Sequence, residues 1–127
     1  MKITLEQAAQ MVADAQTVIL TSHIRPDGDS IGSTLGLMHY LREQGKDARV
    51  LIDDEIPRIF HILPGVEQIE RSAEGMRYTA DLLIVCDVEL KRTGAVLDAV
   101  DAVRVLNIDH HVTNDEAAEY LYLNPDY

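Results

Sequence analysis

The chain has 127 residues, a formal net charge of −11, and hydrophobic and charged fractions of 46% and 26%. This length suits one domain with a single core, and no stretch is biased toward disorder. The acidic surplus argues against a protein that grips long duplex nucleic acid through a basic face. It agrees with simple solubility or with a carboxylate-rich metal site, and charge alone does not choose between them.

No segment predicts a membrane span or a signal peptide. The central apolar run from Leu82 to Cys86 is far shorter than the ~20 residues that a membrane helix needs. The N-terminus lacks the apolar stretch and small-residue cleavage site of a signal peptide. Cys86 is the only cysteine, which excludes an internal disulfide, and a lone buried thiol agrees with a reducing compartment. We therefore expect a cytoplasmic protein.

The first third of the chain predicts two helices around a strand. Thr4–Gln7 has the capping-box pattern of a helix start, and the apolar spacing after it predicts a helix over about 5–15. The run 17–21 predicts a buried strand, and the proline and glycine of 23–30 predict a loop after it. Apolar residues at helical spacing then predict a helix from Ser30 to Glu43.

Three glycines mark this second helix. Gly45 is well placed to end it. Gly32 and Gly36, four residues apart, suggest close packing of the helix on a sheet, and a helix that merely tolerates glycine explains them equally well.

The rest of the chain alternates strands with helices or turns. Strands are predicted at 48–52, 81–86, 103–108 and 120–123, with a turn-rich segment over 56–65 and a helix around 95–100. The strands are apolar nearly throughout rather than at every second residue. This pattern predicts a mainly parallel sheet covered on both faces, which is a doubly wound α/β fold.

Polar clusters follow three of the predicted strands. They are His23 to Asp29, Asp87, and Asp109-His110-His111. The carboxyl ends of parallel strands share one edge, where open α/β sheets bind their ligands, so we expect the clusters to converge.

The first cluster has the spacing of a two-metal site. Pro26 keeps the loop extended and Gly28 permits a sharp turn, so Asp27 and Asp29 can point apart toward different ions. Mixed carboxylate and imidazole ligands, with His23 at the strand end, favour Mn²⁺ over Mg²⁺.

Each cluster also has a simpler interpretation. Asp87 could cap a following helix, and residues 109–111 could form a surface turn. An exposed side chain is the simpler reading of Arg25, which otherwise could help to bind phosphate. We interpret His39 and His61 as structural and the run 53–55 as a solvated acidic turn.

The motifs resemble those of the DHH phosphoesterases, a superfamily named for the tripeptide that stands here as Asp109-His110-His111. His23 to Ser33 matches the first motif, His-x-x-Pro-Asp-Gly-Asp-Ser-Ile-Gly-Ser, in full. Arg92-Thr93-Gly94 is similar to the Arg-x-Gly that follows the family's second motif, and Ile108 to Asn114 matches the third. The resemblance implies a Rossmann-like DHH domain.

Within the superfamily, the segment from Asp53 to Gly65 resembles the branch of oligoribonucleases and 3′-phosphoadenosine-5′-phosphate phosphatases. This implies hydrolysis of short RNA or small nucleotides by a hydroxide that two divalent metal ions activate, with Mn²⁺ expected and Mg²⁺ or Co²⁺ as alternatives. A manganese-dependent inorganic pyrophosphatase is the runner-up, although Gly28 and Val88 depart from its usual pattern. A cyclic or linear dinucleotide phosphodiesterase stays open.

Carried over by position, the resemblance implies a role for each motif residue. The first metal would be held by His23, Asp27 and Asp87, and the second by Asp29, Asp87 and His110. His111 would contact the scissile phosphate, and Asp109 would orient an imidazole.

The resemblance covers residues 1–127 as one domain. The chain would end before the family's fourth motif and before the C-terminal domain that binds the nucleotide end of the substrate. A fragment that binds metal or nucleotide without turnover is therefore an alternative. We also keep a homodimer open, because an uncovered sheet edge could pair with a copy of itself.

Overall fold

The computed structural model describes residues 1–25, 27–71, 77–88, 90, 93–94, 96–110, 114, 116 and 118–124. Its strands are β1 (Thr17–Thr21), β2 (Asp47–Ile52), β3 (Glu70–Arg71), β4 (Tyr78–Cys86), β5 (Val100–Asp109) and β6 (Tyr120–Leu123). Within the described residues these six strands form one sheet in the order β3-β2-β1-β4-β5-β6, and all neighbours run parallel.

The helices are α1 (Leu5–Asp14), α2 (Gly28–Glu43) and α3 (Val96–Ala99), with short 3₁₀ turns at Arg58–Phe60 and Val66–Gln68. The predicted capping box starts α1, because the Thr4 hydroxyl accepts the Gln7 N–H at 3.1 Å and the Gln7 side chain accepts the Thr4 N–H at 2.9 Å. In the described part of the chain, no helix has the length and hydrophobicity needed to cross a bilayer.

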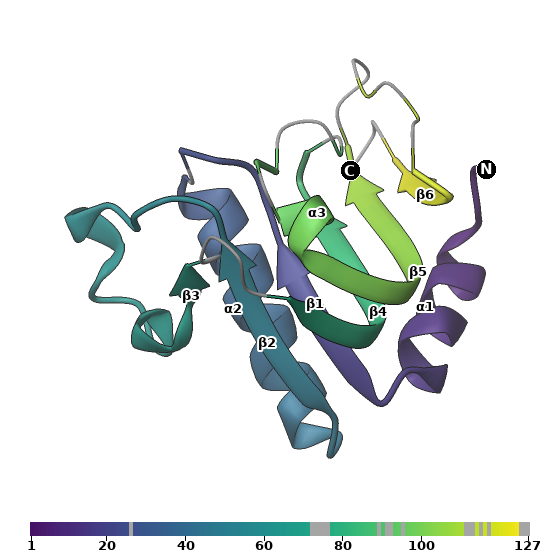
Figure 1. The fold of residues 1–127 in the computed structure, drawn as a ribbon, viewed down its shortest axis with the longest axis horizontal. Coiled ribbons are helices and arrows are strands. Elements are labelled where there is room, and N and C mark those ends of the chain that lie inside the picture. The colour runs from purple at the N-terminus through teal and green to yellow at the C-terminus, as the bar shows by residue number, and fades with distance from the viewer. Residues whose placement is uncertain are drawn as a thin grey trace.

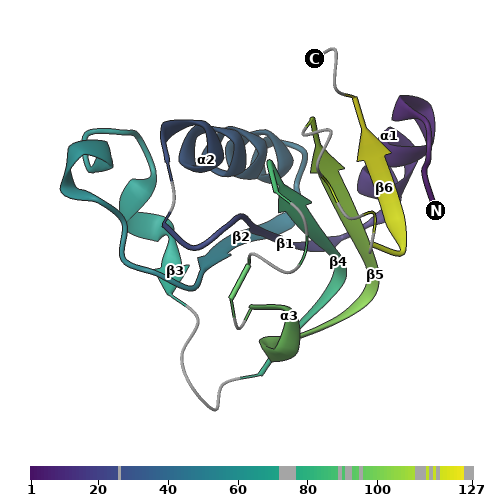
Figure 2. The same ribbon diagram turned by 90° about the horizontal axis from the view of Figure 1, so that it is seen from above.

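The sheet is covered on both faces. Figure 2 shows α1 and α2 on one face and α3 on the other. Met11 of α1 and Met38 of α2 pack on the first face against strand residues such as Leu20, whereas Val96 of α3 packs on the second against Leu83. Two apolar layers therefore fix the sheet between the helices.

The direction of winding reverses at β1. This strand pairs with β2 on one side and with β4 on the other (Figure 1). A reversal of this kind opens a crevice outside the carboxyl ends of the two central strands. The predicted doubly wound α/β fold is confirmed, and the crevice lies where β1 and β4 end.

Two local predictions differ from the structure, and a third is confirmed. Helix α2 begins at Gly28 rather than Ser30, because the Asp27 carboxylate caps it by accepting the Ser30 N–H at 2.9 Å. The close packing suggested for Gly32 and Gly36 is wrong, because a Cβ at either position would meet open space. Gly45 does follow the end of α2, with the left-handed φ of 82° that favours glycine there.

Strand β3 was not predicted, and β4 and β5 begin earlier than expected. At the other edge, the N-terminal segment pairs with β6: the N–H of Ile3 donates to Leu121 at 2.8 Å, and the N–H of Leu121 donates to Met1 at 2.9 Å. The N-terminal segment therefore covers β6 at Leu121, and a homodimer through an uncovered sheet edge stays a prediction.

Candidate metal centre

The ends of three neighbouring strands carry the polar clusters. His23 follows β1 by two residues, Asp87 directly follows β4, and Asp109 is the last residue of β5 with His110 after it. Because β1, β4 and β5 are adjacent and parallel, these side chains lie at one edge of the sheet. Among the described residues they form two groups that could each hold a metal ion.

The first group joins the first loop to β4. His23, Asp27 and Asp87 each offer a ligand atom, and these atoms lie within 4.8 Å of one another. The Nε2 atom of His23 lies 3.7 Å from Oδ2 of Asp27. The Nδ1 atom of His23 is 2.7 Å from the Ile24 carbonyl, which can only accept, so Nδ1 carries the proton. The lone pair of Nε2 is then free to bind a cation, as in most histidine ligands.

Asp27 divides its two oxygens between two tasks. Oδ1 caps α2 by accepting the Ser30 N–H, and Oδ2 faces His23. The Ser30 N–H is the main reason that the pKa of Asp27 is lowered, with a further contribution from His23. A carboxylate held ionised in this way suits a cation ligand.

The second group lies between β4 and β5. Asp87, Asp109 and His110 offer ligand atoms within 4.8 Å of one another. The Nε2 atom of His110 lies 2.7 Å from Oδ1 of Asp87. Asp87 belongs to both groups, as a bridging ligand would.

Asp109 lies within the second group, although the sequence analysis predicted that it would orient an imidazole rather than offer a ligand atom. It is only 4% exposed, and its carboxylate accepts the backbone N–H of His110 and the side-chain amide of Asn114, both at 2.8 Å. These two hydrogen bonds fix the Asp109 carboxylate beside Asp87. Its position at a strand end directly before His110 was a signal for this role. The predicted bond from Asp109 to an imidazole stays a prediction.

Some predicted site residues lie outside what the structure describes. These are His111, the side chain of Asp29, and the motif residues Pro26 and Arg92. Their predicted roles therefore stay predictions.

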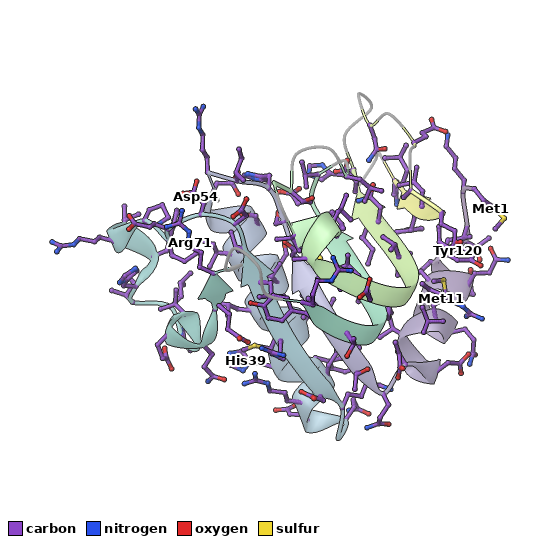
Figure 3. The ribbon with its side chains drawn as sticks, viewed as in Figure 1. Met1, Met11, His39, Asp54, Arg71 and Tyr120 are labelled. Carbon is purple, nitrogen blue, oxygen red and sulfur yellow. The ribbon has the colours of Figure 1, made fainter. Side chains whose placement is uncertain are left out.

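Arg25 and the acidic turn meet at the edge of the site. Arg25 is exposed, its backbone has a left-handed φ of 57°, and its N–H donates to Asp54 at 2.9 Å. That N–H is the main cause of the lowered pKa of Asp54, and the charge of Arg71, on the same side of the molecule, adds to it (Figure 3). The Asp54 carboxylate therefore holds the first loop by accepting the backbone N–H of Arg25.

The neighbouring Asp53 packs against Gly94, the glycine of the Arg-x-Gly motif. Gly94 has a φ of 69°, and a Cβ added there would overlap the Asp53 carboxylate. The prediction that residues 53–55 form only a solvated turn was incomplete, because two of its carboxylates contact loops that carry motif residues.

His39 and His61 lie apart from the two groups, and each contacts a nearby carbonyl. Nε2 of His39 is 3.3 Å from the Pro64 carbonyl, and Nε2 of His61 is 3.0 Å from the Ile56 carbonyl. Figure 3 shows His39 on the flank of α2, well below the strand ends. These contacts agree with the structural role predicted for both.

A cavity of about 340 Å³ opens beside the second group. Its walls come from α1 and α2, including Val12 and Leu37, and Ile108 and Tyr122 contribute from the sheet. Asp87, Asp109 and His110 line one end of it. The site therefore continues into a space with mainly apolar walls.

Comparisons with known proteins agree on one family. Residues 17–127 match the model of the DHH family, N-terminal domain. The chain is 34% identical over 108 residues to the bifunctional oligoribonuclease and PAP phosphatase NrnA of Thermus thermophilus, covering 85% of this chain and 32% of that protein. The proteins of the same name from Bacillus subtilis and Mycoplasma genitalium are each 26% identical, over 85% and 91% of this chain and 33% and 36% of theirs.

A solved structure adds the fold to this agreement. The crystal structure of an exopolyphosphatase-related protein from Bacteroides fragilis is similar with a TM-score of 0.83 and 28% identity, over 96% of this chain and 38% of that one. The chain spans about a third of the length of the curated relatives it matches. By its motifs, its fold and the match over residues 17–127, the chain belongs to the DHH family.

Proposed function

We propose that this chain is the cation-binding part of a phosphoesterase that hydrolyses short oligoribonucleotides or small nucleotides such as 3′-phosphoadenosine 5′-phosphate. The observation that carries the proposal is the position of Asp87, whose carboxylate belongs to both ligand groups at the sheet edge. A residue shared in this way is what two neighbouring cations require, and two-metal sites are a recurring solution for phosphate ester hydrolysis.

The chemistry of the donors fits divalent transition metals. The two groups combine carboxylate oxygens with imidazole nitrogens, and Nε2 of His23 is free to coordinate. His23, Asp27 and Asp87 would hold one ion, and Asp87 and His110 the other, together with Asp29 and with Asp109 as a further candidate. We propose Mn²⁺ as the ion, with Co²⁺ and Mg²⁺ as alternatives. When bound, the ions would make a water molecule more nucleophilic and offset negative charge on the phosphoryl oxygens.

The chain's own residues would hold and orient the reacting groups. The Ser30 N–H donates to Asp27 and lowers its pKa below the ordinary value, which favours the ionised form that binds a cation. Asp109 is fixed by two hydrogen bonds, which keep its carboxylate beside Asp87. His111 is proposed to contact the scissile phosphate, and Arg25, which is exposed at the same edge, to meet an outer phosphate.

Three observations support the substrate class. Three similar proteins are named for activity on oligoribonucleotides and PAP. The net charge of −11 disfavours a grip on long duplex nucleic acid. The cavity beside the second group is about 340 Å³, a volume within the range of small-molecule pockets. The cytoplasmic location inferred from the lone cysteine stays a prediction.

Calorimetric titration of the chain with Mn²⁺ tests the proposal, followed by assays on a 5′-phosphorylated dinucleotide, on 3′-phosphoadenosine 5′-phosphate and on pyrophosphate. We expect Mn²⁺ binding that Asp87→Asn abolishes at both groups. Asp81→Asn is the matched control, because Asp81 lies on the same strand in its amino-terminal half, away from Asp87, where it accepts the N–H groups of Gln16 and Thr17.

The outcomes separate the alternatives. Absence of Mn²⁺ binding, or equal binding by Asp87→Asn, would reject the metal centre. Turnover of pyrophosphate alone would favour the pyrophosphatase. Mn²⁺ binding without turnover of any substrate would identify a binding-only fragment.

A further inference from the structure

Asn107 is a buried polar residue near the end of β5, two positions before Asp109. It is 1% exposed, and burial of an amide is costly unless its hydrogen-bonding groups are satisfied. Its Nδ2 donates to the carbonyls of Val85 at 3.0 Å and Val88 at 2.7 Å. Those carbonyls lie two residues before and one residue after Asp87, so a single side chain spans the turn that carries the shared carboxylate.

That turn has a backbone conformation that needs support. Asp87 has a φ of 65°, which is uncommon for a residue with a Cβ and costs on the order of 1 kcal/mol or more. The Asp87 N–H donates to the Ile108 carbonyl at 2.8 Å. Both attachments come from β5, so the direction of the Asp87 side chain depends on that strand.

The same amide also connects to the second ligand group. Asn114 donates through Nδ2 to Oδ1 of Asn107 at 3.0 Å and to Oδ2 of Asp109 at 2.8 Å. Oδ1 of Asn114 accepts the Glu116 N–H at 2.7 Å, which fixes the orientation of this amide. The donors and acceptors match along the network, which therefore joins the Asp87 turn to the Asp109 carboxylate.

We infer that Asn107 is a positioning residue that sets the Asp87 carboxylate relative to Asp109 and His110. The inference rests on the proposed function, since it assumes that the two groups hold cations. Asn107 contacts no cation itself. It acts by donating to the two carbonyls that flank Asp87, and the loss of these donors lets the shared carboxylate turn away from both groups.

Two substitutions separate the donors from the rest of the side chain. Asn107→Leu keeps the branched shape, with a somewhat larger volume, and removes every side-chain hydrogen bond. Asn107→Asp keeps the acceptor for Asn114 but loses both donors to the backbone. If the donors are what matters, both variants weaken Mn²⁺ binding, and the retained acceptor does not rescue Asn107→Asp. Asn107→Ser, whose shorter side chain has a single O–H donor and cannot bond to both carbonyls, replaces either variant that fails to fold.

The experiment is a Mn²⁺ titration of the full chain by calorimetry, with the melting temperature of each variant measured beside it. Replacing a residue that orients a metal ligand typically lowers metal affinity about 10- to 100-fold, and we expect a loss of that size. Asp81→Ala is the control for stability, because it removes a side-chain link between β4 and the amino end of β1. It is expected to lower the melting temperature and to leave Mn²⁺ affinity unchanged.

The failures can be told apart. If the wild-type chain binds no Mn²⁺, both the proposed function and this inference are rejected. If the wild-type chain binds Mn²⁺ and a folded Asn107 variant binds it equally well, only the inference is overturned. It is also overturned if Asp81→Ala weakens binding as much as the Asn107 variants do, because the effect would then be one of general stability.

Discussion

Two glycine-to-alanine substitutions are predicted to change stability in opposite directions. Gly94 has a φ of 69°, and a Cβ there would overlap the Asp53 carboxylate. The left-handed conformation alone costs a residue with a Cβ about 1–2 kcal/mol, and displacement of Asp53 adds to this. Gly36 lies exposed on α2, and a Cβ there meets no atom within 4 Å. Alanine at that position should stabilise the helix by roughly 0.5–1 kcal/mol.

Urea unfolding followed by circular dichroism measures both changes on the same scale. Gly94→Ala is expected to lower the free energy of unfolding by about 1–3 kcal/mol, and Gly36→Ala to raise it by roughly 0.5–1 kcal/mol. Gly94→Ala should also weaken Mn²⁺ binding. The added Cβ displaces Asp53 and with it the neighbouring Asp54, which holds the first loop through the N–H of Arg25. A stable Gly94→Ala variant would refute the contact between Gly94 and the acidic turn.

Three further predictions concern the rest of the chain. Burial raises the pKa of the Cys86 thiol to about 12, so a thiol reagent at pH 8 should label the native chain at least a hundredfold more slowly than the urea-unfolded chain. Arg25→Ala should change the free energy of unfolding by no more than about 0.5 kcal/mol, because Arg25 bonds to Asp54 through its backbone N–H. A larger loss would show that the Arg25 side chain also stabilises the fold. The side chain of Arg49 lowers the pKa of Glu70, so this pair stabilises the fold above the unfolded pKa of Glu70 and loses that effect as pH falls through the lowered value. Arg49→Leu should therefore flatten the dependence of unfolding free energy on pH between about 3 and 6. An unchanged slope would contradict this prediction.

The sheet and the site edge were predictable because local signals agree with the tertiary structure. Strand β1 is a short apolar run that is buried on both faces, and it has the bounds predicted for it. The clusters beginning at His23, Asp87 and Asp109 each follow an apolar strand, and parallel pairing brings the ends of those strands together. Here the spacing along the chain carried enough information to bring these candidate ligands to one edge of the sheet.

Other features depend on partners that are distant in sequence. Strand β3 has two residues, and it exists because Glu70 and Arg71 pair with the end of β2. The amino end of β4 lies outside the apolar run and is a strand because it pairs with Val100 and its neighbours in β5. The sequence pattern of the acidic turn indicates a solvated segment. Its contacts, from Asp54 to Arg25 and from Asp53 to Gly94, join three separate loops, so no local pattern predicts them.

Asp27 shows that a motif residue can also have a structural role that the motif does not indicate. The spacing from Asp27 to Ser30 is that of a capping box, and both of its hydrogen bonds are present. The same aspartate belongs to the first ligand group through its other oxygen, which faces His23. A helix cap needs only one carboxylate oxygen, so the second is free for a cation. Formation of the first turn of α2 therefore directs Oδ2 toward His23, and the start of this helix and the geometry of the first group depend on one side chain.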